Sequence, residues 1–117
     1  AVSAPSHCKL MEAASKRLSD MLDTISLQSP QIPIVNNADA KFLSKPEEIK
    51  DSLVRQLNQP LLWEESVKLM IQNGVDTFIE VGPKKVLAGL LKRIDSNVKI
   101  LNVEDTKTLD ETLKALG

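Results

Sequence analysis

The 117-residue chain has a single cysteine, Cys8, and a single histidine, His7. One cysteine cannot form a disulfide within the chain, and this usage fits a reducing compartment. One histidine and one cysteine cannot build a His-rich or Cys/His metal cage. The sequence therefore predicts neither an internal disulfide nor a metal site of that kind.

Aromatic side chains and excess positive charge are also scarce. The three aromatic residues include no tyrosine, and 15 lysines and arginines stand against 16 acidic residues. Base stacking needs aromatic surface, and phosphate binding needs a positive excess, so a nucleic-acid partner is not expected. No apolar run approaches the roughly 20 residues that cross a bilayer, so no membrane partner is expected either. The first ten residues lack a signal peptide's basic start and apolar stretch, and we expect a cytoplasmic protein.

The composition that is present, 42% apolar and 26% charged, is typical of a globular domain, and the length favours one domain. Apolar residues at helical spacing predict a first helix over residues 6–26. The members of this apolar stripe are Leu10, Ala14, Leu18, Met21, Leu22 and Ile25. Residues 32–35 then predict a short extended segment, with a turn at Asn36-Asn37 because asparagine tolerates positive φ.

Two further helices are predicted in the middle of the chain. The pattern Ser44-Lys45-Pro46-Glu47 is typical of a capping box at a helix start, and Pro60 should stop that helix. A third helix is predicted over residues 61–73, with Gly74 as its C′ residue.

The last part of the chain alternates between strand and helix patterns. Residues 75–81 and 98–103 predict strands, while residues 84–94 and 106–116 predict amphipathic helices. A strand–helix–strand unit of this length implies two adjacent parallel strands. Parallel sheets need cover on both faces. The predicted strands are too few for five helices, which indicates that the sheet is incomplete.

Few residues suggest chemistry on their own. His7 can titrate near neutral pH and follows a Pro-Ser turn, which fits a functional residue or a surface helix cap. Cys8 cannot pair with it as a nucleophile, because helical neighbours at i and i+1 do not face each other. We expect Cys8 to be a small buried apolar residue.

Basic residues cluster around the turn between the predicted strand over residues 75–81 and the helix that follows it. The sequence Gly82-Pro83-Lys84-Lys85 follows a strand and could bind an anion at a helix start, yet it matches no phosphate-loop motif, and a plain strand-to-helix turn is favoured. The cluster of Lys84, Lys85, Lys92 and Arg93 predicts either a solvated helix face or a surface for an acidic partner.

Four strings in register resemble one family. The first three are Val2-Ser3-Ala4-Pro5-Ser6-His7-Cys8, Pro33-Ile34-Val35-Asn36-Asn37, and Leu53-Val54-Arg55-Gln56-Leu57 with Pro60 and Trp63. The fourth is Glu80-Val81-Gly82-Pro83 followed by Lys85-Val86-Leu87, Gly89-Leu90 and Lys92-Arg93-Ile94. In this order and spacing they resemble the C-terminal third of bacterial malonyl-CoA:acyl-carrier-protein transacylases. One departure is Lys84, where those enzymes carry glycine.

The resemblance implies a ping-pong transfer of malonyl from CoA to the phosphopantetheine thiol of acyl carrier protein, in fatty-acid synthesis and without a further cofactor. It implies that His7 is the general base and that the backbone carbonyl of Gln56 orients its ring. Ser6 matches a position that borders the acyl pocket. Lys84, Lys85, Lys92 and Arg93 could help to dock the carrier protein.

The same resemblance implies that parts of the enzyme lie outside this sequence. The G-H-S-x-G nucleophile elbow, the malonyl-binding arginine, the oxyanion-hole glutamine and the small ferredoxin-like subdomain are absent. The expected fold is therefore α/β: residues 1–117 as the helix-rich, βαβ-containing C-terminal part of the large hydrolase-like subdomain, with Ala1 near the subdomain junction. Such a fragment would rejoin the N-terminal remainder of the enzyme and be inactive alone. Two alternatives are a free-standing α/β module that docks acyl carrier protein, and the same segment of a polyketide acyltransferase domain.

Overall fold

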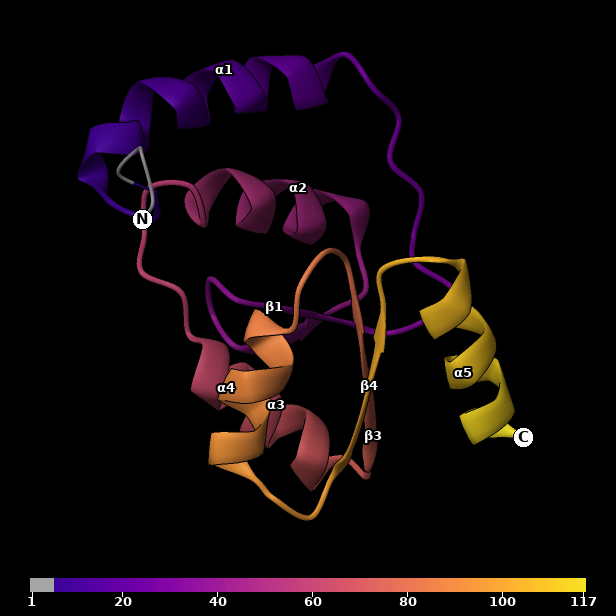
Figure 1. Ribbon diagram of the computed structural model, residues 1–117. Helices are drawn as coiled ribbons and strands as arrows, with labels where there is room; N and C mark the ends of the chain where they lie inside the picture. Colours follow the sequence, from indigo (N-terminus) through magenta and orange to yellow (C-terminus); the bar gives the residue numbers. More distant parts are fainter. Residues whose placement is uncertain (1–5) are drawn as a thin grey trace. The chain divides into compact units, whose positions relative to one another are not determined.

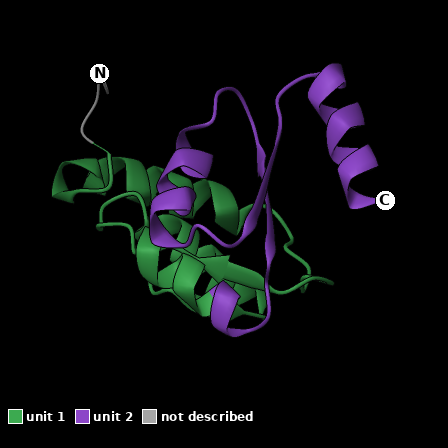
Figure 2. Ribbon diagram, turned by 60° about the horizontal axis from the view of Figure 1, so that its bottom comes forward, with its two compact units in different colours: residues 1–69 green, residues 70–117 purple. Residues whose placement is uncertain are grey.

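The computed structural model describes residues 6–117, and it divides into two compact units, residues 1–69 and 70–117 (Figure 2). Each unit is described by itself. The predictions for Ala1 and for the stretch Val2-Ser3-Ala4-Pro5 lie outside the described residues. Within the described part, five α-helices and four short strands make a mixed α/β structure, as expected.

Unit 1 holds a helical pair and a small hairpin (Figure 1). Its elements are the 3₁₀ turn η1 (Lys9–Met11), α1 (Glu12–Asp23), β1 (Ile34–Asn36), β2 (Lys41–Leu43), α2 (Pro46–Arg55) and most of α3 (Trp63–Gln72). Helix α1 packs against α2, and the hydroxyl of the buried Ser15 donates to the carbonyl of Val54 at 3.1 Å. This hydrogen bond ties α1 to the last turn of α2.

Helix α1 begins later than residue 6, where the sequence predicted its start. His7 has a positive φ of 58°, which lies in the left-handed region, so a right-handed helix cannot run through it. The apolar stripe is also only partly covered: Leu18 and Leu22 are half-buried, whereas Leu10, Met21 and Ile25 are exposed.

Helix α2 also starts one residue later than the capping box predicts. Its N-cap is Lys45, and Pro46 occupies the first helical position, because the fixed φ of proline suits that position and it needs no amide partner. Ser44 lies just outside, and its backbone N–H donates to Glu48 Oε2 at 3.5 Å. The helix ends at Arg55 with Gln56 as C-cap, well before Pro60.

Strand β1 confirms the predicted extended segment, but its partner β2 was not predicted. The two strands pair antiparallel, with Ile34 opposite Leu43, and form a two-stranded sheet of their own. Three residues of strand are too short to show an alternating pattern in the sequence. Ala40, with φ 51°, supplies the left-handed turn residue that the sequence analysis assigned to Asn36-Asn37.

Unit 2 contains the predicted strand–helix–strand unit. Its elements are β3 (Thr77–Val81), α4 (Val86–Ile94), β4 (Lys99–Val103) and α5 (Thr106–Leu116). Strands β3 and β4 pair parallel from Thr77↔Lys99 to Val81↔Val103, which confirms the expected adjacent parallel pair. Helix α5 has the predicted bounds, and Asp105 and Thr108 cap each other's backbone N–H at its start. Gly74 follows α3 with φ 91°, as a C′ glycine should.

The apolar core is small for the number of helices. Among the described residues the buried apolar side chains are Ala38, Leu43, Val67 and Leu91. In unit 2, Val81 on β3 and Val86 on α4 remain 79% and 62% exposed. These side chains belong to elements that bury one face in complete α/β sheets, so the sheet is incomplete in this chain. No helix among residues 6–117 is long and apolar enough to cross a bilayer.

Candidate active site

The centre of the candidate site is a hydrogen bond between His7 and Gln56. The ring Nδ1 of His7 lies 2.6 Å from the backbone carbonyl oxygen of Gln56. A carbonyl can only accept, so Nδ1 carries the proton and donates it. In the neutral ring Nε2 is then unprotonated and free to accept a proton, which is the form that a general base needs.

The backbone at His7 explains why the ring reaches Gln56. Its left-handed φ turns the chain directly before Cys8, which is extended and caps the 3₁₀ turn η1. Histidine is one of the non-glycine residues enriched in this region. The imidazole is thus half-buried beside the end of α2 instead of lying along α1.

The carbonyl of Gln56 is available because it lies at a helix end. The last carbonyls of an α-helix have no partner within the helix. At the end of α2, the Val54 carbonyl accepts from the N–H of Leu57 at 3.4 Å and also from the Ser15 hydroxyl. The Arg55 carbonyl accepts from the N–H of Asn58 at 3.2 Å, and the Gln56 carbonyl accepts from His7. His7 and Ser15 thereby each donate to one carbonyl at this helix end.

The other residues near His7 contribute less to the site. Ser6 is exposed, and nothing in the described structure tests its predicted role beside an acyl pocket. Cys8 is only half-buried, so the expectation that it is a buried apolar residue is wrong. The reason is the turn at His7, which places Cys8 before the helix rather than on its inner face.

The predicted basic cluster of Lys84, Lys85, Lys92 and Arg93 lies in unit 2, and all four side chains are exposed. Lys92 and Arg93 lie in the last turn of α4, but the helix begins at Val86, two residues later than predicted. Lys84 and Lys85 therefore lie in the turn before the helix instead of on its face. Lys84 has a positive φ of 70°.

The start of α4 is occupied by the chain's own carboxylate. Glu80 accepts hydrogen bonds from the N–H groups of Leu87 at 3.1 Å and Ala88 at 2.8 Å. An anion at this helix start would have to displace Glu80, so the strand-to-helix turn is structural. No sequence pattern indicates this role of Glu80, since only the fold shows that the end of β3 faces the start of α4.

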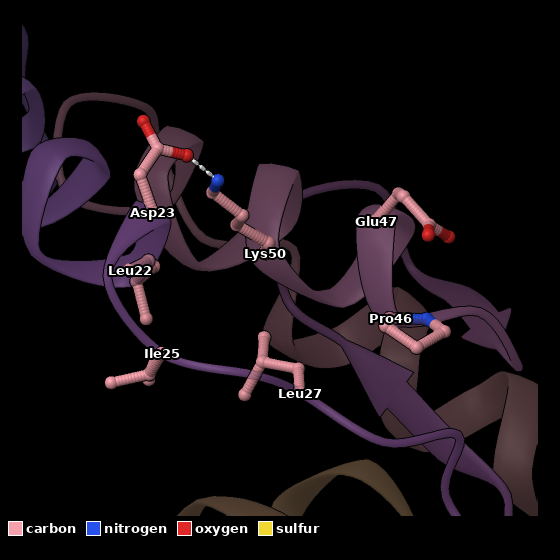
Figure 3. Close-up of a pocket in the computed structure, with 7 residues that line it drawn as sticks. All are labelled: Leu22, Asp23, Ile25, Leu27, Pro46, Glu47 and Lys50. Carbon is pink, nitrogen blue, oxygen red and sulfur yellow. Dashed lines mark ion pairs between the residues drawn. The ribbon is translucent and has the colours of Figure 1, made fainter.

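Two other features of the described residues do not form a site. Within residues 6–117, no group of three or more His, Cys, Asp or Glu side chains is placed to hold a metal ion. A hollow of about 220 Å³ lies between the end of α1 and the start of α2, at the ends of these helices remote from Gln56 (Figure 3). The ion pair between Asp23 and Lys50 spans it.

Known proteins with similar sequences identify the segment. No family model matches the chain. It is 36% identical over 115 residues to the malonyl CoA-acyl carrier protein transacylase of Bacillus subtilis, covering 98% of this chain, and 48% identical over 93 residues to that of Escherichia coli, covering 80%. The chain is homologous to a segment of bacterial malonyl-CoA:acyl-carrier-protein transacylases. It spans about a third of these curated relatives, 36% and 30% of their lengths.

Solved structures agree with the transacylase homology. An acyl carrier protein S-malonyltransferase from Vibrio cholerae matches 96% of this chain with a TM-score of 0.87 and 44% identity. A malonyl-transacylase in complex with a type II PKS acyl-carrier protein matches 98% of it with a TM-score of 0.90 and 43% identity. This chain covers 37% of each of those chains, so the homologous segment keeps the fold that it has within longer enzymes.

Proposed function

We propose that this chain supplies the base-bearing segment of a malonyl-CoA:acyl-carrier-protein S-malonyltransferase of fatty-acid synthesis. The observation that carries the proposal is the hydrogen bond from His7 Nδ1 to the Gln56 carbonyl, in a segment homologous to malonyl transacylases. The bond holds the imidazole of His7 in the one neutral tautomer that can accept a proton at Nε2.

In the proposed first half-reaction, a serine outside this chain attacks the thioester carbonyl of malonyl-CoA. His7 Nε2 takes the serine proton, and the resulting imidazolium returns it to the departing CoA sulfur. In the second half-reaction, Nε2 takes the proton of the carrier protein's phosphopantetheine thiol, the thiolate attacks the malonyl-serine ester, and the serine oxygen recovers the proton. The Gln56 carbonyl stabilises the positive ring at both stages, a task that a buried aspartate performs in a triad.

The remaining parts of the site are proposed to lie in additional polypeptide. These are the nucleophile elbow, the arginine for the malonyl carboxylate, the oxyanion-hole donor and the small ferredoxin-like subdomain, while residues 1–117 form the C-terminal part of the large subdomain. Two facts support this division: the chain spans about a third of its relatives, and the two-stranded sheet of unit 2 leaves Val81 and Val86 uncovered. Ser6 would border the acyl pocket beside the base.

Acyl carrier protein is the proposed macromolecular partner. A homologous malonyl-transacylase forms a complex with an acyl-carrier protein. The exposed Lys84, Lys85, Lys92 and Arg93 are cations that an acidic carrier protein could contact. The carrier protein in that complex belongs to a type II PKS. A polyketide carrier protein is therefore the second candidate for the acceptor of the malonyl group.

The test of the proposal is the His7→Ala variant in a complete transacylase that contains this segment. We expect transfer to fall about 10²–10⁴-fold, the usual contribution of general base catalysis. The matched control is Gln56→Ala, which keeps the backbone carbonyl and should lose far less activity. A folded His7→Ala enzyme with full activity would refute the proposal, and equal losses in both variants would refute the role of the Gln56 carbonyl. A natural gene product no longer than this chain would favour the free-standing module.

A further inference from the structure

Arg55, the last residue of α2, uses three of its side-chain nitrogens in hydrogen bonds to two carboxylates beside the candidate site. Its Nη1 and Nη2 donate to Oδ1 and Oδ2 of Asp39 at 2.7 and 2.6 Å, and its Nε donates to Oδ2 of Asp51 at 2.7 Å. The Asp39 and Arg55 side chains are only 27% and 30% exposed. A two-pronged guanidinium–carboxylate pair fixes direction as well as distance, which a single ion pair does not.

Asp39 is itself held firmly by the turn between β1 and β2. Its Oδ2 also accepts from Asn36 Nδ2 at 3.0 Å, and Asn36 Oδ1 accepts from the backbone N–H of Lys41 at 3.1 Å. The backbone carbonyl of the buried Asn36 accepts from the hydroxyl of Ser66 at 3.2 Å. The carboxylate that binds Arg55 therefore belongs to a turn held by further hydrogen bonds, and its ion pair with Arg55 joins the end of α2 to that turn.

Gln56 follows Arg55 directly, and its carbonyl is the acceptor of His7 Nδ1. Helix ends fray, and fraying of the last turn of α2 would change the direction of this carbonyl. We propose that the Asp39–Arg55 pair is a positioning device for His7: it holds the last turn of α2 so that the Gln56 carbonyl keeps the imidazole in its Nδ1–H form. This inference rests on the proposed function only in assigning catalytic use to His7.

The Asp39–Arg55 pair keeps its charge near neutral pH. Hydrogen bonds from Arg55 and Asn36 hold the pKa of Asp39 well below its usual range. The hydrogen bonds that Arg55 donates to Asp39 and Asp51 raise the pKa of Arg55 above its usual value. Both partners of the pair therefore stay charged at the pH at which the transfer reaction would run.

His7 is the chain's only histidine, so its ring nitrogens give an unambiguous NMR signal. Nitrogen chemical shifts of the chain labelled at histidine report the ratio of the two neutral tautomers. Free histidine favours Nε2–H, and we expect the wild-type chain to favour Nδ1–H. Asp39→Asn and Arg55→Lys should each lower the Nδ1–H share several-fold, because Asn loses the charge and Lys loses the two-pronged geometry.

The matched control is Asp23→Asn. It removes the ion pair between the end of α1 and Lys50 in the middle of α2 (Figure 3), which does not involve the last turn of α2, so it should leave the tautomer ratio unchanged. In a complete transacylase, Asp39→Asn should lower kcat about tenfold and leave the KM for malonyl-CoA within about twofold, since a displaced base slows chemistry more than binding.

Two results would overturn the positioning role. One is a folded Asp39→Asn or Arg55→Lys chain with the wild-type tautomer ratio. The other is loss of the fold in both variants, as judged by circular dichroism, because the pair would then serve the fold alone. If His7→Ala leaves transfer intact while Asp39→Asn shifts the tautomer, only the proposed function fails. If His7→Ala abolishes transfer and Asp39→Asn changes neither tautomer nor kcat, only the positioning role fails.

Discussion

The backbone N–H of Lys84 donates to Glu104 Oε2 at 2.7 Å, across the turn that leads from β3 into α4. The Lys84 carbonyl accepts from Asn102 Nδ2 at 3.0 Å, so both backbone groups of this residue are held by β4 and the loop after it. Together these bonds stabilise a left-handed lysine, at the position where the family resemblance leads us to expect glycine. A lysine in place of the expected glycine therefore adds backbone strain as well as a positive charge.

Replacing Lys84 by glycine should stabilise unit 2. A left-handed conformation costs a non-glycine residue about 1–2 kcal/mol, while glycine adds about 0.5–1 kcal/mol of unfolded-chain entropy, so we expect a net gain of roughly 0.5–1 kcal/mol. Urea unfolding of the chain measures it. The control is Lys85→Gly, because Lys85 has a φ of −135° and no such strain. A Lys84→Gly chain that is destabilised as much as Lys85→Gly would contradict this account.

Local sequence patterns predicted unit 2 better than unit 1. The amphipathic helix over residues 106–116 starts at an aspartate and ends at a glycine, and the βαβ unit follows from hydrophobic patterns of adequate length. Strand β2 has only three residues, and the left-handed φ of His7 accompanies a contact with a residue 49 positions away, so neither has a local signature.

The candidate site could be predicted only through the family resemblance. His7 and Gln56 lie 49 positions apart, and no periodicity relates them. The ion pair of Asp39 and Arg55 joins a turn to a helix end 16 positions away, and Glu80 caps a helix from the preceding strand. Such contacts depend on the tertiary arrangement, which a single sequence does not disclose.

The stability of the chain should depend on the charge of Asp39 at acid pH. The pKa of this carboxyl is lowered in the folded state, first by its hydrogen bonds to Arg55. Its contribution is therefore complete above the unfolded value of about 4 and is lost as pH falls below it. The difference in unfolding free energy between wild type and Asp39→Asn should be constant from pH 7 to about 5 and shrink toward pH 3. Urea titrations at each pH measure it, and a difference independent of pH would contradict it.

Charge reversal should test the proposed docking surface. Lys85→Glu with Lys92→Glu, in a complete transacylase, should raise the KM for acyl carrier protein several-fold at low salt and much less at high salt. The KM for malonyl-CoA should stay nearly unchanged. The matched control reverses Lys16 and Lys45, two exposed lysines of unit 1. Equal rises for both substrates would place the charges at a CoA site or indicate misfolding.

The isolated 117 residues should transfer no malonyl group and form no stable acyl-enzyme. His7 is held in the tautomer of a base, but a base without its nucleophile has no hydroxyl to activate. Ser6 adjoins the base, yet it lies before the turn at His7 and not at a strand-to-helix elbow, where backbone N–H groups would stabilise the oxyanion.

The test of this inactivity is incubation of the chain with radiolabelled malonyl-CoA, followed by a denaturing gel. Addition of the missing polypeptide as a separate chain should restore label, on that chain and not on this one, and His7→Ala should abolish the restored label. Label retained on this chain alone, and lost when one of its own serines is replaced, would overturn the division of the active site. The nucleophile would then lie within these 117 residues, and His7 would serve a complete site in this chain.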